Sequence, residues 1–69
     1  MKNVVLSGDE FNNGLLLFQK GPTKKEILPN DKVNGLINQG LADIDEHEVI
    51  ALSEKGMQYY RKYEEDVAQ

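Results

Sequence analysis

The residues with the greatest potential for chemistry form an acidic stretch that holds the only histidine of the chain, His47. The stretch runs from Asp43 to Glu48 and has the letters DIDEHE. A calcium-binding loop would require glycine at its sixth position, where Glu48 stands. The HExxH motif of zinc proteases would require a second histidine where Ala51 stands. The stretch therefore predicts no metal site, and we interpret it as a solubilising turn.

Catalytic chemistry has no candidate set of residues either. Covalent catalysis needs an activated nucleophile beside a base. The chain has no cysteine, and no serine motif accompanies His47. Tyr59, Tyr60 and Tyr63 could stack on bases, but their helical spacing favours packing in a core. We therefore predict that the protein is not an enzyme and uses no metal and no cofactor.

A second group of residues has the chemistry of nucleic-acid contact. It combines lysines and amides: Lys24, Lys25, Lys32, Asn34 and Asn38. Lysine binds phosphate, and asparagine can pair with adenine through two hydrogen bonds. Glu26 and Asp31 interrupt the group, so a solvated pair of helices accounts for the lysines equally well.

Charge is unevenly distributed along the 69 residues, whose net charge is -4. Residues 1–40 hold five lysines against four acidic residues, which leaves +1. Residues 41–69 hold three basic against eight acidic residues, which leaves -5. A polyanion would therefore have to bind between Lys20 and Lys32.

The length allows one domain with one modest core, which we place over residues 1–69. The longest apolar run has four residues, far fewer than the roughly 20 that cross a bilayer. We therefore expect a cytoplasmic protein without membrane contact. Residues 1–6 are expected to form an N-terminal extension. Residues 64–69 are expected to fray at the end of a last helix, because acidic side chains oppose the helix dipole there.

A helix over residues 8–20 is the first element that the sequence predicts. Ser7 and Glu10 form a capping box at its start, and a Gly-Pro pair follows its end. The letters NNG in its middle also allow a turn, with a strand over residues 15–18. The capping box and the hydrophobic staple beside it favour the helix.

The remaining elements are shorter. A second capping box predicts a short helix over residues 23–28, and a third helix is predicted to begin at Asn30 or Asp31 and to end at Gly40. A hairpin with an acidic tip and a final helix capped by Ser53 follow. The apolar faces of these elements predict one core: Leu15, Phe18, Val33, Leu36, Ile37, Leu41, Ile50, Leu52 and Tyr60.

Two stretches of the sequence resemble prokaryotic winged-helix regulators. Gly40-Leu41, a hairpin and the letters LSEKGMQYY over residues 52–60 resemble the ending GL(V/I) … L(T/S)xxGxxYL of many such proteins. The letters LLLFQKGPTKKEI over residues 15–27 resemble their LLxxxGPxTxxEL opening. The resemblance covers residues 11–63. It implies an α+β, mostly α fold, a small winged helix with three helices, a two-stranded wing hairpin and a C-terminal helix.

The resemblance also implies a function. In that family the third helix usually enters the major groove of DNA. Bases would then meet the exposed side of that helix, which carries Lys32, Asn34, Gly35 and Asn38, and the second helix would contact phosphate through Lys24 and Lys25. A homodimer is implied, because one such helix reads few base pairs. The usual role of the fold narrowly favours this DNA-binding, transcription-regulator hypothesis.

The alternative is a winged helix that binds a protein. The wing carries four acidic residues where a DNA-contacting wing would carry lysine or arginine: Asp43, Asp45, Glu46 and Glu48. Such a wing would complement a basic protein surface. The charge pattern favours this second hypothesis.

Overall fold

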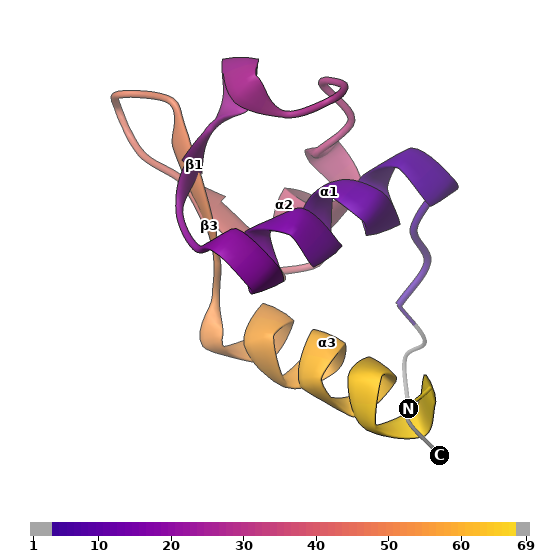
Figure 1. Ribbon diagram of the computed structural model, residues 1–69. Helices are drawn as coiled ribbons and strands as arrows, with labels where there is room; N and C mark the ends of the chain where they lie inside the picture. Colours follow the sequence, from indigo (N-terminus) through magenta and orange to yellow (C-terminus); the bar gives the residue numbers. More distant parts are fainter. Residues whose placement is uncertain (1–3, 68–69) are drawn as a thin grey trace.

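The computed structural model describes residues 4–67. Its elements are α1 (Gly8–Lys20), β1 (Thr23–Lys24), the 3-10 turn η1 (Lys25–Ile27), α2 (Asn34–Asn38), β2 (Ala42–Ile44), β3 (Val49–Leu52) and α3 (Glu54–Val67) (Figure 1). They form a small α+β fold with three α-helices and one antiparallel sheet in the order β1-β3-β2. No helix among the described residues is long and apolar enough to cross a membrane.

The predicted first helix is confirmed, and the alternative strand over residues 15–18 is wrong. The Ser7 hydroxyl accepts a hydrogen bond from the Glu10 N–H at 3.2 Å. The Ser7 N–H donates to the Glu10 carboxylate at 2.9 Å. Gly21 ends the helix with φ of 87°, a backbone conformation that glycine adopts without a steric penalty.

The predicted helix over residues 23–28 is wrong. Thr23 and Lys24 instead pair with Ile50 and Val49 as the edge strand β1, and only the three residues of η1 turn. The Thr23 hydroxyl donates to the Gly21 carbonyl oxygen at 3.0 Å and caps no helix. Two strand residues show no alternation of polar and apolar side chains, so the sequence pattern could not reveal this strand.

The predicted start of the third helix is also wrong. That helix, α2, begins only at Asn34, because the Asn30 side chain makes other hydrogen bonds and does not cap a helix. The Asn30 carboxamide oxygen accepts from the Lys32 N–H at 2.8 Å and from the Asn13 amide at 2.9 Å. The segment before α2 is therefore a turn bonded to α1. Gly40, with φ of 74°, lies just past the helix as predicted.

The hairpin and the last helix match the sequence more closely. Strands β2 and β3 pair in the register Ala42↔Leu52, and the Ser53 hydroxyl caps α3 by accepting from the Gly56 N–H at 3.2 Å. The helix continues to Val67, through residues that were expected to fray. Residues 68–69 lie outside the described part of the chain. Of the three tyrosines whose spacing favoured packing in the core, Tyr63 is 39% exposed, and Val67, one turn further along the helix, is 64% exposed.

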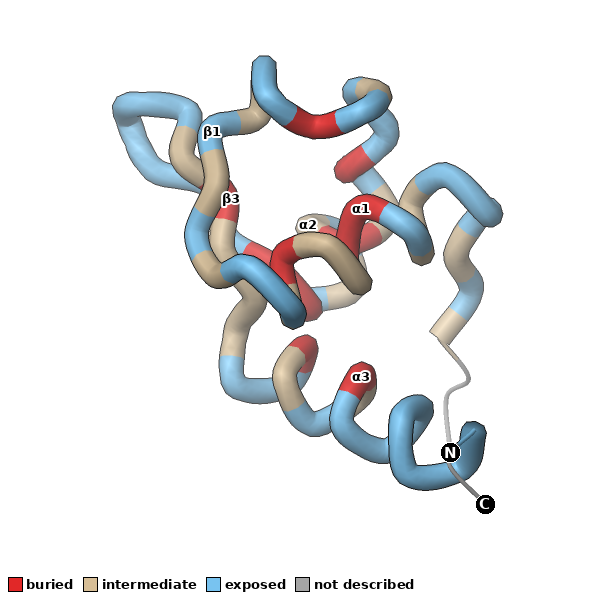
Figure 2. The backbone as a smooth tube through the Cα atoms, in the orientation of Figure 1, coloured by how far each residue is buried: buried red, intermediate tan, exposed pale blue. Residues whose placement is uncertain are grey.

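The core lies between α1, the sheet and α3 (Figure 2). All nine predicted core residues belong to it, five of them buried and four packed around those. The sequence missed three further buried apolar residues, Leu17, Leu28 and Ala42. At its centre the Tyr60 hydroxyl donates to the Phe11 carbonyl oxygen at 2.9 Å, and burial raises the pKa of this phenol.

The predicted N-terminal extension is a docked segment where it is described. Val4 and Leu6 pack against the core. The Val5 N–H donates to the Gln39 carboxamide oxygen at 3.0 Å. The Gln39 amide in turn donates to the Val5 carbonyl oxygen at 2.7 Å. The segment therefore belongs to the folded domain, while residues 1–3 lie outside the described range.

Candidate interaction site

The predicted basic and acidic residues meet at one end of the sheet. Lys24 lies exposed in β1, opposite Val49. The N–H of the next residue, Lys25, donates to the Glu48 carbonyl oxygen at 2.9 Å. The two lysines proposed to contact phosphate therefore adjoin the acidic hairpin directly, and Lys32 lies apart from them in the turn before α2.

The helix predicted to read bases is very short. With 3.6 residues per turn, the five residues of α2 make about one and a half turns. Asn34 and Asn38 are exposed and four residues apart, so both lie on one face. The prediction that Gly35 faces bases is wrong. Its N–H donates to the Glu10 carboxylate at 2.6 Å, and a Cβ at this position would overlap that carboxylate.

Glu10 connects two helices through one carboxylate. One oxygen accepts the Ser7 N–H at the start of α1, and the other accepts the Gly35 N–H in the first turn of α2. These backbone hydrogen bonds, that from Ser7 foremost, lower the pKa of Glu10 below its ordinary value of 4.5. The capping box in the sequence reveals the first bond. The second joins residues 25 positions apart and left no local signal.

We predict that Glu10→Gln reduces both the stability and its acid dependence. Because the folded state lowers the pKa of Glu10, the stabilisation is complete above about pH 4.5 and is lost as the pH falls through the folded-state pKa. Removing the charge should cost about 1 kcal/mol at pH 7, as for other helix caps. The measurement is urea unfolding between about pH 3 and pH 7.

Asp9→Asn provides the matched control for this prediction. It removes a neighbouring carboxylate from the first turn of α1 that makes no side-chain hydrogen bond to another residue in the range 4–67. Asp9→Asn should keep the parent's loss of stability in acid. Equal pH profiles for Glu10→Gln and the parent would contradict the double-capping role.

The acidic hairpin is held by its own side chain. One Asp45 carboxylate oxygen accepts the N–H groups of His47 and Val49 at 2.8 and 3.0 Å. Glu48 closes the turn with φ of 59°, in the left-handed region. Asp45 therefore fixes the turn, a role that the sequence analysis missed although aspartate commonly initiates turns.

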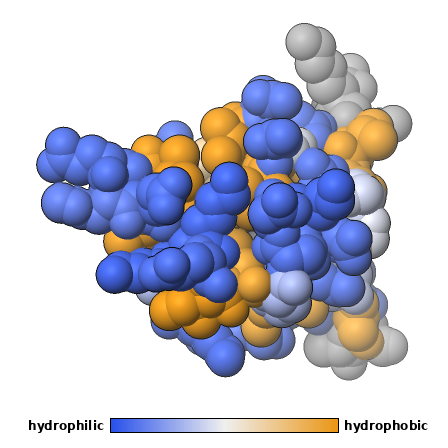
Figure 3. Space-filling view, turned by 90° about the horizontal axis from the view of Figure 1, so that it is seen from above, coloured by the Kyte–Doolittle hydropathy of each residue, from blue (hydrophilic) through white to orange (hydrophobic). Residues whose placement is uncertain are grey.

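The other carboxylates of the hairpin face solvent. Asp43, Glu46 and Glu48 are all exposed, and the hairpin forms the hydrophilic projection at the left of Figure 3. Within the described chain, no group of three histidine, cysteine or acidic residues is arranged to hold a metal ion. The hairpin thus presents negative charge on a fixed turn.

Comparison of the chain with protein-family models, curated proteins and solved structures finds no match.

Proposed function

We propose that the chain is a small non-enzymatic winged-helix module that binds a basic protein surface through its acidic hairpin. The winged-helix assignment is supported by the order of the elements, in which helices α1 and α2 precede the β2–β3 hairpin and α3 follows it. The hairpin then corresponds to the wing.

The contact between Lys25 and Glu48 carries the choice of a protein partner over DNA. A phosphate that approached Lys24 and Lys25 would also approach the carboxylates of the hairpin. The negative charges of the phosphate and the carboxylates repel each other and so oppose binding. Salt screens such repulsion only partly over distances below about 10 Å. A basic protein at the hairpin would meet the same two lysines, but the four exposed carboxylates of the hairpin outnumber them, and this net negative charge would speed association.

The fixed turn supports the same proposal. Binding costs less conformational entropy when the contacting loop is already ordered, and the two hydrogen bonds to Asp45 order this one. Glu48 occupies a left-handed backbone position that costs a residue with a side chain about 1–2 kcal/mol. Glycine would avoid this cost, so the backbone conformation alone would favour glycine at this position. The turn carries a carboxylate there instead.

DNA binding is the second candidate, because Asn34 and Asn38 expose two amides on one face of α2. It would rely on the three lysines for phosphate contact. Their neutralisation should then abolish binding, and the log–log salt slope of the parent should be about -3 if each lysine meets one phosphate.

The test compares two probes, a random-sequence DNA duplex and a lysine- and arginine-rich peptide, at about 50 mM salt. We expect the peptide to bind and the duplex to show no affinity tighter than about 1 mM. The triple variant D43N/E46Q/E48Q should lose peptide binding and leave the Asp45 turn intact. The triple variant K24Q/K25Q/K32Q should retain it.

A matched control removes the same number of charges elsewhere, in the variant E54Q/E64Q/E65Q on α3. Equal losses in the two acidic variants would show that net charge alone attracts the peptide, which would refute the hairpin as the site. Duplex binding that disappears in the lysine variant and strengthens in the hairpin variant would establish the DNA hypothesis instead.

A further inference from the structure

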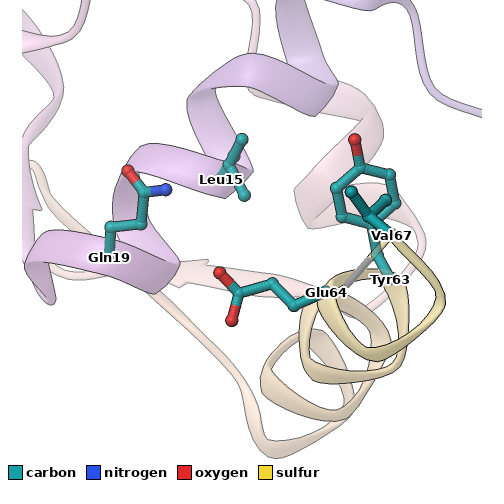
Figure 4. Close-up of a pocket in the computed structure, with 5 residues that line it drawn as sticks. All are labelled: Leu15, Gln19, Tyr63, Glu64 and Val67. Atoms are coloured by element: carbon teal, nitrogen blue, oxygen red, sulfur yellow. The ribbon is translucent and has the colours of Figure 1, made fainter. Parts of the chain in front are cut away.

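A hollowed part of the surface lies along α3, away from the hairpin. A groove of about 420 Å³ separates α1 from the end of α3, lined by Leu15, Gln19, Tyr63, Glu64 and Val67 (Figure 4). A second hollow of about 220 Å³ adjoins it, lined by Tyr59, Lys62, Tyr63 and Asp66. Tyr63 borders both, so it stands as a ridge between them.

An apolar stripe runs along this ridge. Tyr59, Tyr63 and Val67 are spaced four residues apart, which places them on one face of the helix. At its start the stripe joins the core, where the Phe11 and Tyr63 rings meet at 4.8 Å between centroids. Beyond that point α3 passes the body of the domain, and every residue over 61–67 is exposed (Figures 1 and 2). Within residues 4–67, the end of the stripe thus borders the groove and stays uncovered, with Val67 64% exposed.

Two opposite charges flank the stripe on one side. Lys62 and Asp66 are one helical turn apart and border the same hollow. Neither makes an ion pair within 4 Å among residues 4–67. Lysine before an acidic residue is also the weaker order for a pair four apart in one helix. Within the described part of the chain, the two charges are therefore available to a partner.

The order of these charges makes the face complementary to itself. The centre of the face lies between Tyr63 and Glu64. Lys62 comes before this point in the sequence, and Asp66 comes after it. If a second α3 lies antiparallel across this point, Lys62 of each copy faces Asp66 of the other. In the same arrangement the two Tyr63 rings meet, and Val67 lies opposite Tyr59 of the second copy. A two-fold axis produces such reciprocal pairs, because the same patch serves both subunits.

We propose that this face of α3 binds a second copy of the chain, with the two helices antiparallel about a two-fold axis beside Tyr63. The lysine of each copy then lies near the negative end of the other helix, where its charge is favourable. The stripe of one copy covers the stripe of the other. Two helical turns bury less than about 1,200 Å², the lower bound for a standard protein–protein interface. We therefore expect association at micromolar or higher concentrations.

The arrangement leaves both hairpins free, since the hairpin and the end of α3 lie at opposite ends of the molecule (Figure 1). A dimer would therefore present two acidic hairpins at once. This inference does not depend on the proposed function, because neither Lys62 nor Asp66 belongs to the hairpin.

The experiment measures mass by sedimentation equilibrium between about 10 µM and 1 mM, a range that brackets association at this strength. The parent should rise from 7.8 kDa toward twice that mass. K62E and D66K should each remain monomeric, because each places like charges opposite one another. An equimolar mixture of the two should form a heterodimer, since one copy then offers two negative and the other two positive groups. The double variant K62E/D66K should dimerise like the parent.

The control variants R61E and E65K reverse an equally spaced pair on the opposite face of the same helix, and they should dimerise like the parent. V67D, at an exposed apolar position, should weaken dimerisation at least tenfold. Circular dichroism establishes that each variant is folded. A parent that stays at 7.8 kDa at 1 mM, or a K62E variant that dimerises as well as the parent, would overturn the proposal.

Discussion

Replacing Leu36 with alanine should destabilise the domain by about 2–5 kcal/mol. Leu36 is fully buried in α2, at the centre of the core cluster. The substitution removes apolar contacts and leaves a cavity that a close-packed interior fills only in part. The free energy of unfolding of a small domain is only about 5–15 kcal/mol in total. The loss should therefore appear as a lower urea midpoint, with an unchanged slope of the unfolding free energy against urea concentration.

Leu16→Ala is the matched control, because it makes the same chemical change at a half-buried position of α1 that does not belong to the core cluster. It should cost clearly less than the change at Leu36. Similar midpoints for the two variants would mean that α2 does not insert its leucine into the core as described.

The second large effect is expected from Gly56→Ala, at the start of α3. A Cβ there would overlap the carbonyl oxygen of Leu41. That oxygen already accepts the Ser53 N–H at 2.9 Å, so the backbone at Leu41, just before β2, cannot move away without losing a hydrogen bond. We expect a loss of about 3 kcal/mol, the upper part of the range for overpacking, and a melting temperature roughly 12–24 °C lower.

Gly8→Ala makes the same change where a Cβ would meet nothing within 4 Å. It should leave the melting temperature unchanged or raise it slightly, because alanine favours helix more than glycine does. If the two variants melted at the same temperature, the close contact between α3 and Leu41 would be wrong.

Features set by neighbouring residues could be predicted from the sequence. The caps at Ser7 and Ser53 depend on backbone groups only three residues away, so their spacing is visible in the letters. The core could be predicted for the same reason, since helical and strand periodicity repeats over a few residues. These local signals placed α1, the hairpin and α3 correctly.

Features that depend on distant contacts could not be predicted. Strand β1 exists because residues 23–24 pair with β3, and in isolation those residues look like the start of a helix. The true start of α2 depends on Glu10 and on the Asn13–Asn30 bonds, which join separate elements.

The candidate site shows the same division. The sequence identified the lysines and the acidic residues of the hairpin as surface groups, and all of them are exposed except Lys25, which is half-buried. It could not show that Lys25 adjoins Glu48, because this contact follows from the unrecognised pairing of β1 with β3. That contact is the basis of our proposal that the partner is a protein rather than DNA.

The sheet order has a consequence for aggregation. Strands β1 and β2 are its two edges, and exposed edges can recruit strands from other molecules. Both are very short, and charge interrupts each of them, through Lys24 in β1 and Asp43 in β2. Such residues act as gatekeepers against edge-to-edge pairing. The Asp43 carboxylate thus has a consequence beyond partner binding, because it opposes the growth of the sheet into a fibre at the β2 edge.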